Sequence, residues 1–399
     1  MRWELNQVLS LFQVISNIIT TGTGILCAQY IGAGKTLGQK QPLILAALLF
    51  NTGLGVIFSL GALFGSDLLL EMVNIDPELS GYAKEYLSIV GGFLFVQMIT
   101  MTFTVLIRSH GKTKATMGFS LMMNLCNLIL NYILIYGKLG LKPMGVSGAA
   151  IATVISKCLA CAMAGGYLFM KVLPGMSFRP RWRELGGSVK AILAYGSPAA
   201  GEQISYTLSK VVVMSMVNSI SVTAANTYTY VNTVVSYVYL FSMALGQGTS
   251  IMVGWDVGKK EVASARSLCR FSARCAFLVS MGAMVILTLL RREMMDLFTD
   301  DSQIIALGSV VILSNFLLEA GRSRNLVLVN SLRAAGDVRF PLYVGLFSMW
   351  FFSVGVSWLL GMRLGLGLVG IWIGLGLDEC FRAIAMQLRW NKGTWTRFL

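Results

Sequence analysis

The sequence predicts an all-α polytopic membrane protein, and its composition and its apolar runs both indicate this class. Hydrophobic residues make up 55% of the chain and charged residues only 13%, whereas a soluble domain carries roughly 25% charged residues. Apolar runs recur between short polar breaks, and a helix of roughly 20 residues crosses a bilayer core about 30 Å thick. The runs are continuous and do not alternate, so they indicate helices and not strands of a barrel.

Eleven apolar runs are long enough to cross the membrane. They cover residues 6–30, 43–64, 82–107, 116–136, 147–170, 191–217, 224–249, 268–290, 303–329, 341–360 and 368–388. Turn-forming sequences separate them, such as GAGK at 32–35 and PG at 174–175, because Gly and Pro interrupt regular structure. We therefore expect eleven transmembrane helices.

Basic residues predict the orientation of these helices. Alternate loops on one side hold 19 of the 32 Lys and Arg residues, whereas the opposite loops hold six. Cytoplasmic loops carry the excess of Lys and Arg, so we expect a cytoplasmic C-terminus and an outside N-terminus. The same loops explain the net charge of +14, because basic residues beside apolar spans face anionic lipid. The lipid bilayer, and not nucleic acid, is the expected partner.

The chain contains an internal repeat. Arg108 and Gly111 in LIRSHGKTKA (106–115) recur as Arg333 and Gly336 in SLRAAGDVRF (331–340), an interval of 225 residues. Three other landmarks recur in the same order: GAGK at 32–35 and GKKE at 258–261, DPE at 76–78 and DDS at 300–302, and GVSGAAIAT at 145–153 and GLVGIWIGL at 367–375. We therefore expect two parallel halves related by an axis along the membrane normal.

The predicted halves are an N-lobe at 1–170 and a C-lobe at 191–399, joined by a basic cytoplasmic linker at 171–190. The repeated Arg and Gly mark a cytoplasmic turn, where the Arg suits the negative end of a helix and the Gly takes the left-handed conformation. The N-lobe has five spans and the C-lobe six. We expect one helix to be missing before Met1, through a misplaced start or a truncated gene.

Several motifs together resemble the multidrug and toxic compound extrusion (MATE) family of transporters. They are AQYIGAGK at 28–35, NLILNYILIYGKLGLKPMGVSGAAIATVIS at 127–156, YGSP at 195–198, LRAAGDVRFP at 332–341, GLGLVGIWIG at 365–374 and RW at 389–390. The resemblance implies two pseudo-symmetric six-helix bundles in a V shape around a central cavity, here five helices plus six. It also implies alternating access and export of amphiphilic, often cationic, compounds driven by inward flow of H⁺ or Na⁺, with no other cofactor.

Charged residues inside the spans are the candidates for ion coupling. Each costs about 2.5–3.5 kcal/mol at the bilayer centre and therefore needs a partner or a function. The candidate coupling acids are Glu202, Glu319, Asp378 and Glu379, and their candidate charge partners are Lys157, Lys210, Arg322 and Arg382. A structural clamp and a coupling relay both fit these residues. The resemblance adds that relatives couple through acids in the first, seventh and tenth family helices.

Neutral polar side chains are candidates for a substrate cavity. They are Asn127, Asn131, Tyr206, Asn226 and Tyr228. Aromatic faces attract cationic compounds, but such groups also join helices by hydrogen bonds within the membrane. Both interpretations remain open from the sequence.

The chain has few of the residues that enzyme active sites and metal sites use. His110 is its one histidine, and the Cys158 and Cys161 pair inside a span has no second pair for a metal. The resemblance therefore implies a monomeric secondary exporter, and not an enzyme, in the plasma membrane of a bacterium. The alternatives are a flippase for lipid-linked precursors of the same superfamily and a truncated, non-transporting membrane protein.

Overall fold

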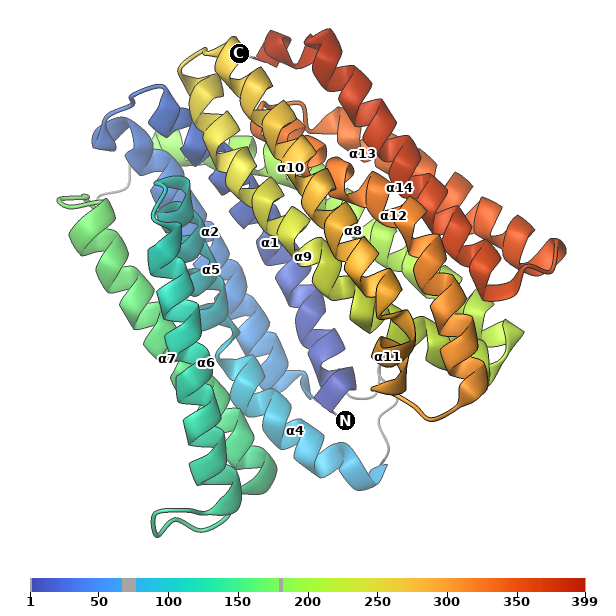
Figure 1. Ribbon diagram of the computed structural model, residues 1–399. Helices are drawn as coiled ribbons and strands as arrows, with labels where there is room; N and C mark the ends of the chain where they lie inside the picture. The colour runs from blue at the N-terminus through green and yellow to red at the C-terminus, as the bar shows by residue number, and fades with distance from the viewer. Residues whose placement is uncertain (1, 67–76, 179–181, 399) are drawn as a thin grey trace. The chain divides into compact units, whose positions relative to one another are not determined.

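The computed structural model describes residues 2–66, 77–178 and 182–398, and its regular elements are all helices (Figure 1). The chain divides into two compact units, unit 1 (Met1–Ala200) and unit 2 (Gly201–Leu399). Their boundary lies within one long helix, α8 (Trp182–Ile220). The lobe limits predicted at 170 and 191 stay a prediction.

Unit 1 contains the helices that precede α8 in the chain. They are α1 (Arg2–Gly32), α2 (Leu37–Phe64), α4 (Pro77–Gly92), α5 (Leu94–Ser109), α6 (Thr113–Tyr136) and α7 (Gly145–Tyr167), which continues as the π-helix η1 (Leu168–Val172). Helices α6 and α7 run side by side as a hairpin (Figure 1). Helix α5 packs against α1, α2 and α7, so it lies at the centre of this unit.

Unit 2 contains the second part of α8 and the helices that follow it. They are α9 (Val222–Gly258), α10 (Val262–Leu289), α11 (Arg291–Asp296), α12 (Ser302–Ala334), α13 (Arg339–Ser348), the π-helices η2 (Met349–Val356) and η3 (Leu359–Arg363), α14 (Gly367–Lys392) and the short 3₁₀ helix η4 (Thr394–Phe398). Helix α12 packs against α9, α10 and α14. Charged residues on α12 and α14 therefore face each other across a buried contact.

Each of the eleven predicted spans coincides with helical structure. Among the described residues, six helices are long and apolar enough to cross a membrane, or seven if the bent pair α4 and α5 counts as one span. An all-helical protein with several membrane spans is confirmed, whereas the number of eleven crossings stays a prediction. The span predicted as one helix at 82–107 is wrong in one respect, because a bend of 42° separates α4 from α5.

The repeated turns have the same backbone geometry in both units. Gly111 has φ +76° and Gly336 has φ +94°, the left-handed region that favours glycine. The N–H of each glycine donates to the carbonyl of the arginine three residues earlier, at 2.8 Å to Arg108 and 3.0 Å to Arg333. In both turns the next N–H donates to the carbonyl five residues earlier, from Lys112 to Ile107 at 3.2 Å and from Asp337 to Leu332 at 2.9 Å. This pattern satisfies the last helix carbonyls.

The GAGK and GKKE turns match in the same way. Gly34 has φ +66° after α1, and Lys260 has φ +64° after α9. Their N–H groups donate to Ile31 and Val257, each three residues earlier, both at 3.0 Å. The DPE landmark begins at residue 76, which is outside the described residues. Its predicted match to DDS therefore stays a prediction.

The glycines of the third landmark also make equivalent contacts. A Cβ at Gly148 would lie 2.8 Å from the carbonyl oxygen of Leu134, and a Cβ at Gly370 would lie 2.8 Å from that of Leu360. The start of α7 therefore packs against the end of α6 in unit 1, and the start of α14 packs against η3 in unit 2. Three landmarks of the repeat thus share backbone conformation or packing.

Helices α1 and α8 cross within unit 1 through two glycines. A Cβ at Gly22 would lie 2.1 Å from the carbonyl oxygen of Ile192, and a Cβ at Gly196 would lie 1.8 Å from that of Ile18. Small residues let membrane helices approach this closely, and the resulting van der Waals contact stabilises their association.

We expect the substitution Gly22→Ala to lower the thermal stability of the detergent-solubilised protein by several degrees. The added methyl group must separate the two backbones, and overpacking of this kind costs about 1–3 kcal/mol. The matched control is Gly53→Ala in α2, where a Cβ meets no atom within 4 Å. Equal melting temperatures for the two variants would contradict the close crossing.

Candidate functional site

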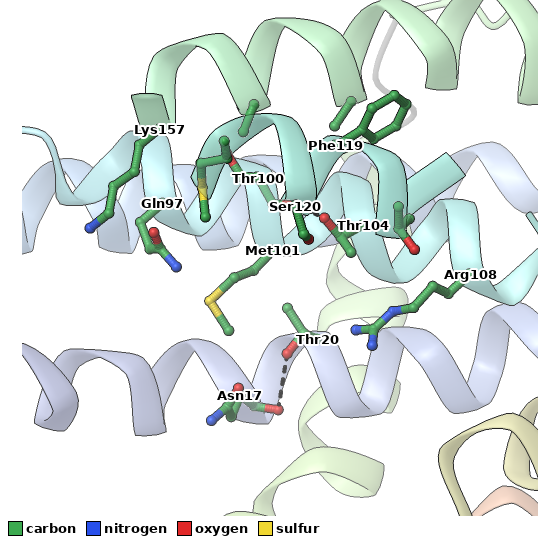
Figure 2. Close-up of a pocket in the computed structure, with 14 residues that line it drawn as sticks. Asn17, Thr20, Gln97, Thr100, Met101, Thr104, Arg108, Phe119, Ser120 and Lys157 are labelled. Atoms are coloured by element: carbon green, nitrogen blue, oxygen red, sulfur yellow. Dashed lines mark hydrogen bonds between the residues drawn. The ribbon is translucent and has the colours of Figure 1, made fainter. Parts of the chain in front are cut away.

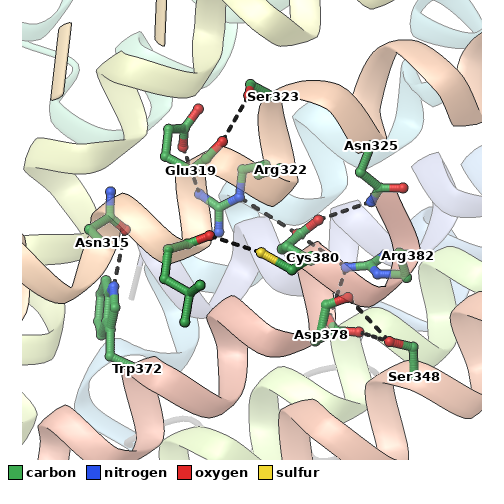
Figure 3. Close-up of polar contacts among 12 residues, drawn as sticks. Asn315, Glu319, Arg322, Ser323, Asn325, Ser348, Trp372, Asp378, Cys380 and Arg382 are labelled. Atoms are coloured by element: carbon green, nitrogen blue, oxygen red, sulfur yellow. Dashed lines mark hydrogen bonds and ion pairs between the residues drawn. The ribbon is translucent and has the colours of Figure 1, made fainter. Parts of the chain in front are cut away.

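A cluster of acids and bases lies among the helices of unit 2 (Figure 3). We call it the charge cluster, and it consists of Glu202, Lys210, Glu319, Arg322, Arg333, Asp378, Glu379 and Arg382. Helices α8, α12 and α14 supply these side chains. The structure thus brings together all four predicted coupling acids and three of their four predicted partners. Lys157 lies in unit 1.

Arg382 on α14 contacts three carboxylates. Its Nη2 lies 3.0 Å from Asp378 Oδ2 and 3.1 Å from Glu379 Oε1, and its Nη1 lies 3.9 Å from Glu202 Oε1. The first two acids lie three and four residues earlier on the same helix, where the helical period brings side chains together. The guanidinium is only 6% exposed, so these ion pairs are poorly screened by water.

Glu379 joins the α14 charges to helix α12. Its Oε1 lies 3.6 Å from Arg322 Nε, and its Oε2 accepts a hydrogen bond of 2.9 Å from Asn325 Nδ2. Arg322 also lies over the ring of Tyr239 on α9, 4.9 Å from its centroid. Glu379 and Arg322 therefore link α14, α12 and α9, and Glu379 has both charge partners and a hydrogen bond.

Glu202 on α8 is held by the turn after α12. Arg333 Nη2 donates to Glu202 Oε2. A Cβ at Gly345 on α13 would lie 3.2 Å from Glu202 Cγ, so the absence of a side chain there leaves room for the carboxylate. Arg333 was predicted as a turn residue only. Its role as a partner of Glu202 was missed, because the two residues lie 131 positions apart.

Glu319 differs from the other acids of the cluster. Its side chain is 0% exposed, and neither of its carboxylate oxygens has a donor at hydrogen-bond geometry, although the Ser280 hydroxyl on α10 lies near enough to favour the charged form. The closest ion-pair contact is with Arg322 Nη1, 4.0 Å from Glu319 Oε2. A buried carboxylate without donors is costly to keep charged. Glu319 is therefore the acid whose charge the structure compensates least.

Asp378 is bound more firmly than Glu319. Ser348 Oγ donates to its Oδ1, and Arg382 Nη2 donates to its Oδ2 at 3.0 Å (Figure 3). Both carboxylate oxygens are thus satisfied. Ser348 and Asn325 donate hydrogen bonds to acids of the charge cluster, and the sequence did not predict them. From sequence, a Ser or Asn in a span that binds an acid cannot be distinguished from one that joins two helices.

The predicted cavity residues of α6 lie in the contact between α6 and α7. Asn131 Nδ2 donates to Asn127 Oδ1 at 2.9 Å, and Asn127 Nδ2 donates to Thr153 Oγ1 at 3.5 Å. These bonds match the alternative interpretation, in which polar groups join helices. A role of Asn127 and Asn131 in substrate binding stays a prediction.

The predicted cavity residues of unit 2 lie in different environments. Tyr228 is buried and packs edge-on against Trp372, with ring centroids 5.5 Å apart. The ring of Tyr206 faces Lys210, whose Nζ lies 5.4 Å from the centroid. Asn226 is exposed on α9. A shared substrate site for these three residues stays a prediction.

A polar pocket of about 240 Å³ lies in unit 1, and we call it the unit 1 pocket (Figure 2). Its lining comes from α1, α5, α6 and α7 and consists of Asn17, Thr20, Gln97, Thr100, Met101, Thr104, Arg108, Thr116, Phe119, Ser120, Met123, Lys157, Ala160 and Ala164. Lys157 and Arg108 lie toward opposite ends of the view, with Asn17, Thr20 and Gln97 between them. Arg108, like Arg333, thus extends beyond its turn.

His110 follows α5 in the turn that the sequence placed in the cytoplasm. Its Nδ1 lies 2.8 Å from the carbonyl oxygen of Leu106. Burial lowers the pKa of this imidazole, and the charge of Lys40 acts in the same direction, although the backbone hydrogen bond opposes them. The ring is therefore neutral at pH 7, which suits a packing role.

Comparisons with known proteins agree with this architecture. A family model described as MatE matches residues 5–133 and 198–359. The uncharacterized transporter YisQ of Bacillus subtilis is 33% identical over 392 residues, which cover 98% of this chain and 86% of that protein. The probable multidrug resistance protein NorM of Halalkalibacterium halodurans is 28% identical, over 95% of this chain and 83% of that protein.

A solved structure shows the same fold. The crystal structure of MATE in the bent conformation matches with a TM-score of 0.87 and 20% identity, over 97% of this chain and 85% of that one. The family model covers more than half of this chain, and members of the family are secondary transporters and not enzymes. The chain therefore belongs to the MATE family of membrane transporters.

Proposed function

We propose that this protein exports amphiphilic, often cationic, organic compounds by alternating access, driven by inward flow of H⁺ or Na⁺. The observation that supports this proposal is the charge cluster, in which four acids of unit 2 lie within membrane helices. Their burial is costly unless it is compensated. An acid whose charge is incompletely compensated is explained if that acid binds and releases the coupling ion during transport.

The cluster divides into a clamp and an exchanging acid. Arg382, Asp378 and Glu379 form the clamp, because each has ion pairs and Asp378 has both oxygens satisfied. No donor meets its carboxylate oxygens at hydrogen-bond geometry, so a proton can neutralise Glu319 with the loss of only its ion pair of 4.0 Å with Arg322. This observation favours H⁺ over Na⁺ at Glu319, because a proton needs only one carboxylate, whereas a metal cation needs several oxygen ligands.

Glu202 is the second exchanging acid in this scheme. It is bound by Arg333 at the end of α12 and lies 3.9 Å from Arg382. Protonation of Glu202 weakens its ion pair with Arg333 and so loosens α8 from the turn between α12 and α13. A change at this carboxylate thereby alters helix packing, which alternating access requires.

The membrane orientation and assembly complete the proposal. The excess of basic residues in alternate loops supports a cytoplasmic C-terminus, in the inner membrane of a bacterium. We place the exporter there as a monomer. Its substrates are small amphiphilic molecules that enter from the cytoplasm or the inner leaflet.

We expect Glu319→Gln to reduce proton-driven efflux of a fluorescent dye from loaded vesicles to the background rate of dye-loaded vesicles without protein. The amide keeps the volume of the side chain but cannot take up and release a proton. The control is Glu293→Gln in α11, whose side chain is exposed and should retain parental efflux. Parental efflux by the Glu319→Gln protein would remove this acid from the coupling scheme.

We expect Glu202→Gln to slow dye efflux under an imposed proton gradient, because Arg333 then loses its charged partner in every state of the cycle. The assay is repeated with a sodium gradient in place of the proton gradient, and Glu293→Gln again serves as the control. If the Glu202→Gln protein extrudes dye at the parental rate under both gradients, Glu202 has no part in coupling.

We expect Arg382→Gln to destabilise the protein by about 3–5 kcal/mol, because removal of one partner leaves buried charges uncompensated. Three carboxylates lose a contact in this variant. The control is Arg324→Gln, in which an exposed arginine of the same helix bundle is neutralised at a cost of about 1 kcal/mol or less. Thermal unfolding of both variants in detergent measures the difference, and equal losses would contradict the clamp.

A further inference from the structure

The unit 1 pocket and the charge cluster occupy repeat-related positions. The intervals of 225 and 222 residues established by the repeated turns and glycines match Gln97 to Arg322 and Lys157 to Glu379. The first pair of positions lies on α5 and α12, and the second on α7 and α14. Arg322 and Glu379 are ion-paired in unit 2. The same two backbone positions in unit 1 line the pocket.

The two turn arginines extend this correspondence. Arg108 lines the unit 1 pocket, whereas its counterpart Arg333 binds the carboxylate of Glu202. Thr100 lines the pocket at the position of Asn325, which donates to Glu379 in unit 2. One fold thus presents hydrogen-bond donors and cations at the same places in both units. In unit 2 a carboxylate of the protein occupies the space between them.

The lining of the unit 1 pocket is basic and neutral. Its fourteen residues include two cations, Lys157 and Arg108, with the amides of Asn17 and Gln97 and several hydroxyl groups. Among the residues that the structure describes, no carboxylate pairs with Lys157. An ammonium in the membrane part of a helix bundle needs a counter-charge. The donors that surround it can bind an anion of one or two oxygen atoms.

The size of the pocket restricts what it can hold. Pockets for drug-sized ligands occupy roughly 300–1,000 Å³, whereas this pocket has about 240 Å³. It therefore suits one polar end of an amphiphile and not the whole molecule. Phe119, Met101 and Met123 also line it, and such apolar, adaptable side chains suit the adjoining part of a varied ligand.

We propose that the unit 1 pocket binds the carboxylate group of an anionic or zwitterionic amphiphile, with Lys157 as its counter-charge. This inference rests on the proposed export function and specifies its substrate class. The carboxylate of the ligand supplies a negative charge beside Lys157, as Glu379 supplies one beside Arg322 and Arg382 in unit 2. A substrate that carries both a cationic group and a carboxylate fits the proposed export of cationic compounds and the proposed carboxylate site.

Fluorescence titration of the purified full chain in detergent tests this site with two matched probes. Dansylglycine carries a carboxylate, and dansylglycinamide replaces it with a neutral amide on the same fluorophore. We expect dansylglycine to bind about tenfold more tightly, a difference of about 1.4 kcal/mol, since a hydrogen bond to a charged group is stronger than one between neutral groups. Equal affinity for the two probes would overturn the proposal.

Variants assign the preference to the pocket. Lys157→Gln should remove the tenfold preference without changing the affinity for dansylglycinamide, and Lys157→Arg should retain most of it. Lys171→Gln, an exposed position in η1, is the control and should behave as the parent. A loss of affinity for both probes in Lys157→Gln, with Lys157→Arg equally impaired, would show a general packing defect and contradict the proposal.

Two further measurements distinguish a carboxylate site from a phosphate site and ligand binding from export. Decanoate should displace dansylglycine at lower concentration than decyl phosphate, and the opposite order would replace a carboxylate site with a phosphate site and overturn the assignment. If parental protein shows the carboxylate preference but exports neither probe from vesicles, the proposed export function fails while the binding site stands.

Discussion

Much of the charge in unit 2 is held in place by one guanidinium, because Arg382 reaches three carboxylates from two helices. Ionised acids in a membrane helix are tolerated when opposite charges and hydrogen bonds replace the water they have lost. Arg382 provides this replacement for Asp378 and Glu379, and Arg333 provides it for Glu202. Glu319 has the weakest compensation, and the proposed scheme therefore assigns ion exchange to Glu319 and a structural role to Asp378 and Glu379.

The repeat uses one backbone to build two electrostatic environments. Both units end a central helix with the same arginine and left-handed glycine, and both pack a glycine so closely against the preceding segment that an added Cβ would lie 2.8 Å from a carbonyl oxygen. Backbone geometry is thus shared, whereas the side chains between the helices differ in sign. Unit 2 has an ion-paired acid at Glu379, and unit 1 has Lys157 beside an open polar pocket. Under the two proposals made above, ion exchange and ligand binding belong to different halves of the duplicated fold.

Much of this architecture was predictable from local patterns. Apolar runs predicted helical segments, because a bilayer requires every backbone group to be hydrogen-bonded within its own helix. The bend of 42° between α4 and α5 was not predictable from hydropathy, since both helices form one apolar run. Pairs spaced three or four residues apart, such as Asp378 and Arg382, followed from the helical period. Asn127 and Asn131 show its limit, because the same stripe fits a cavity and a helix contact.

The amino-acid sequence by itself determined the helices, the repeat, the glycine turns and the small set of ionisable residues within the spans, because each depends on neighbours close in the chain. Tertiary structure alone decided that Arg333 meets Glu202 across 131 residues, that Glu319 lacks hydrogen-bond partners, and that Lys157 lines a pocket. The physical reason is that these contacts depend on how each helix is rotated and packed against others. Rotation and packing arise from the whole set of interhelical contacts and not from any local pattern.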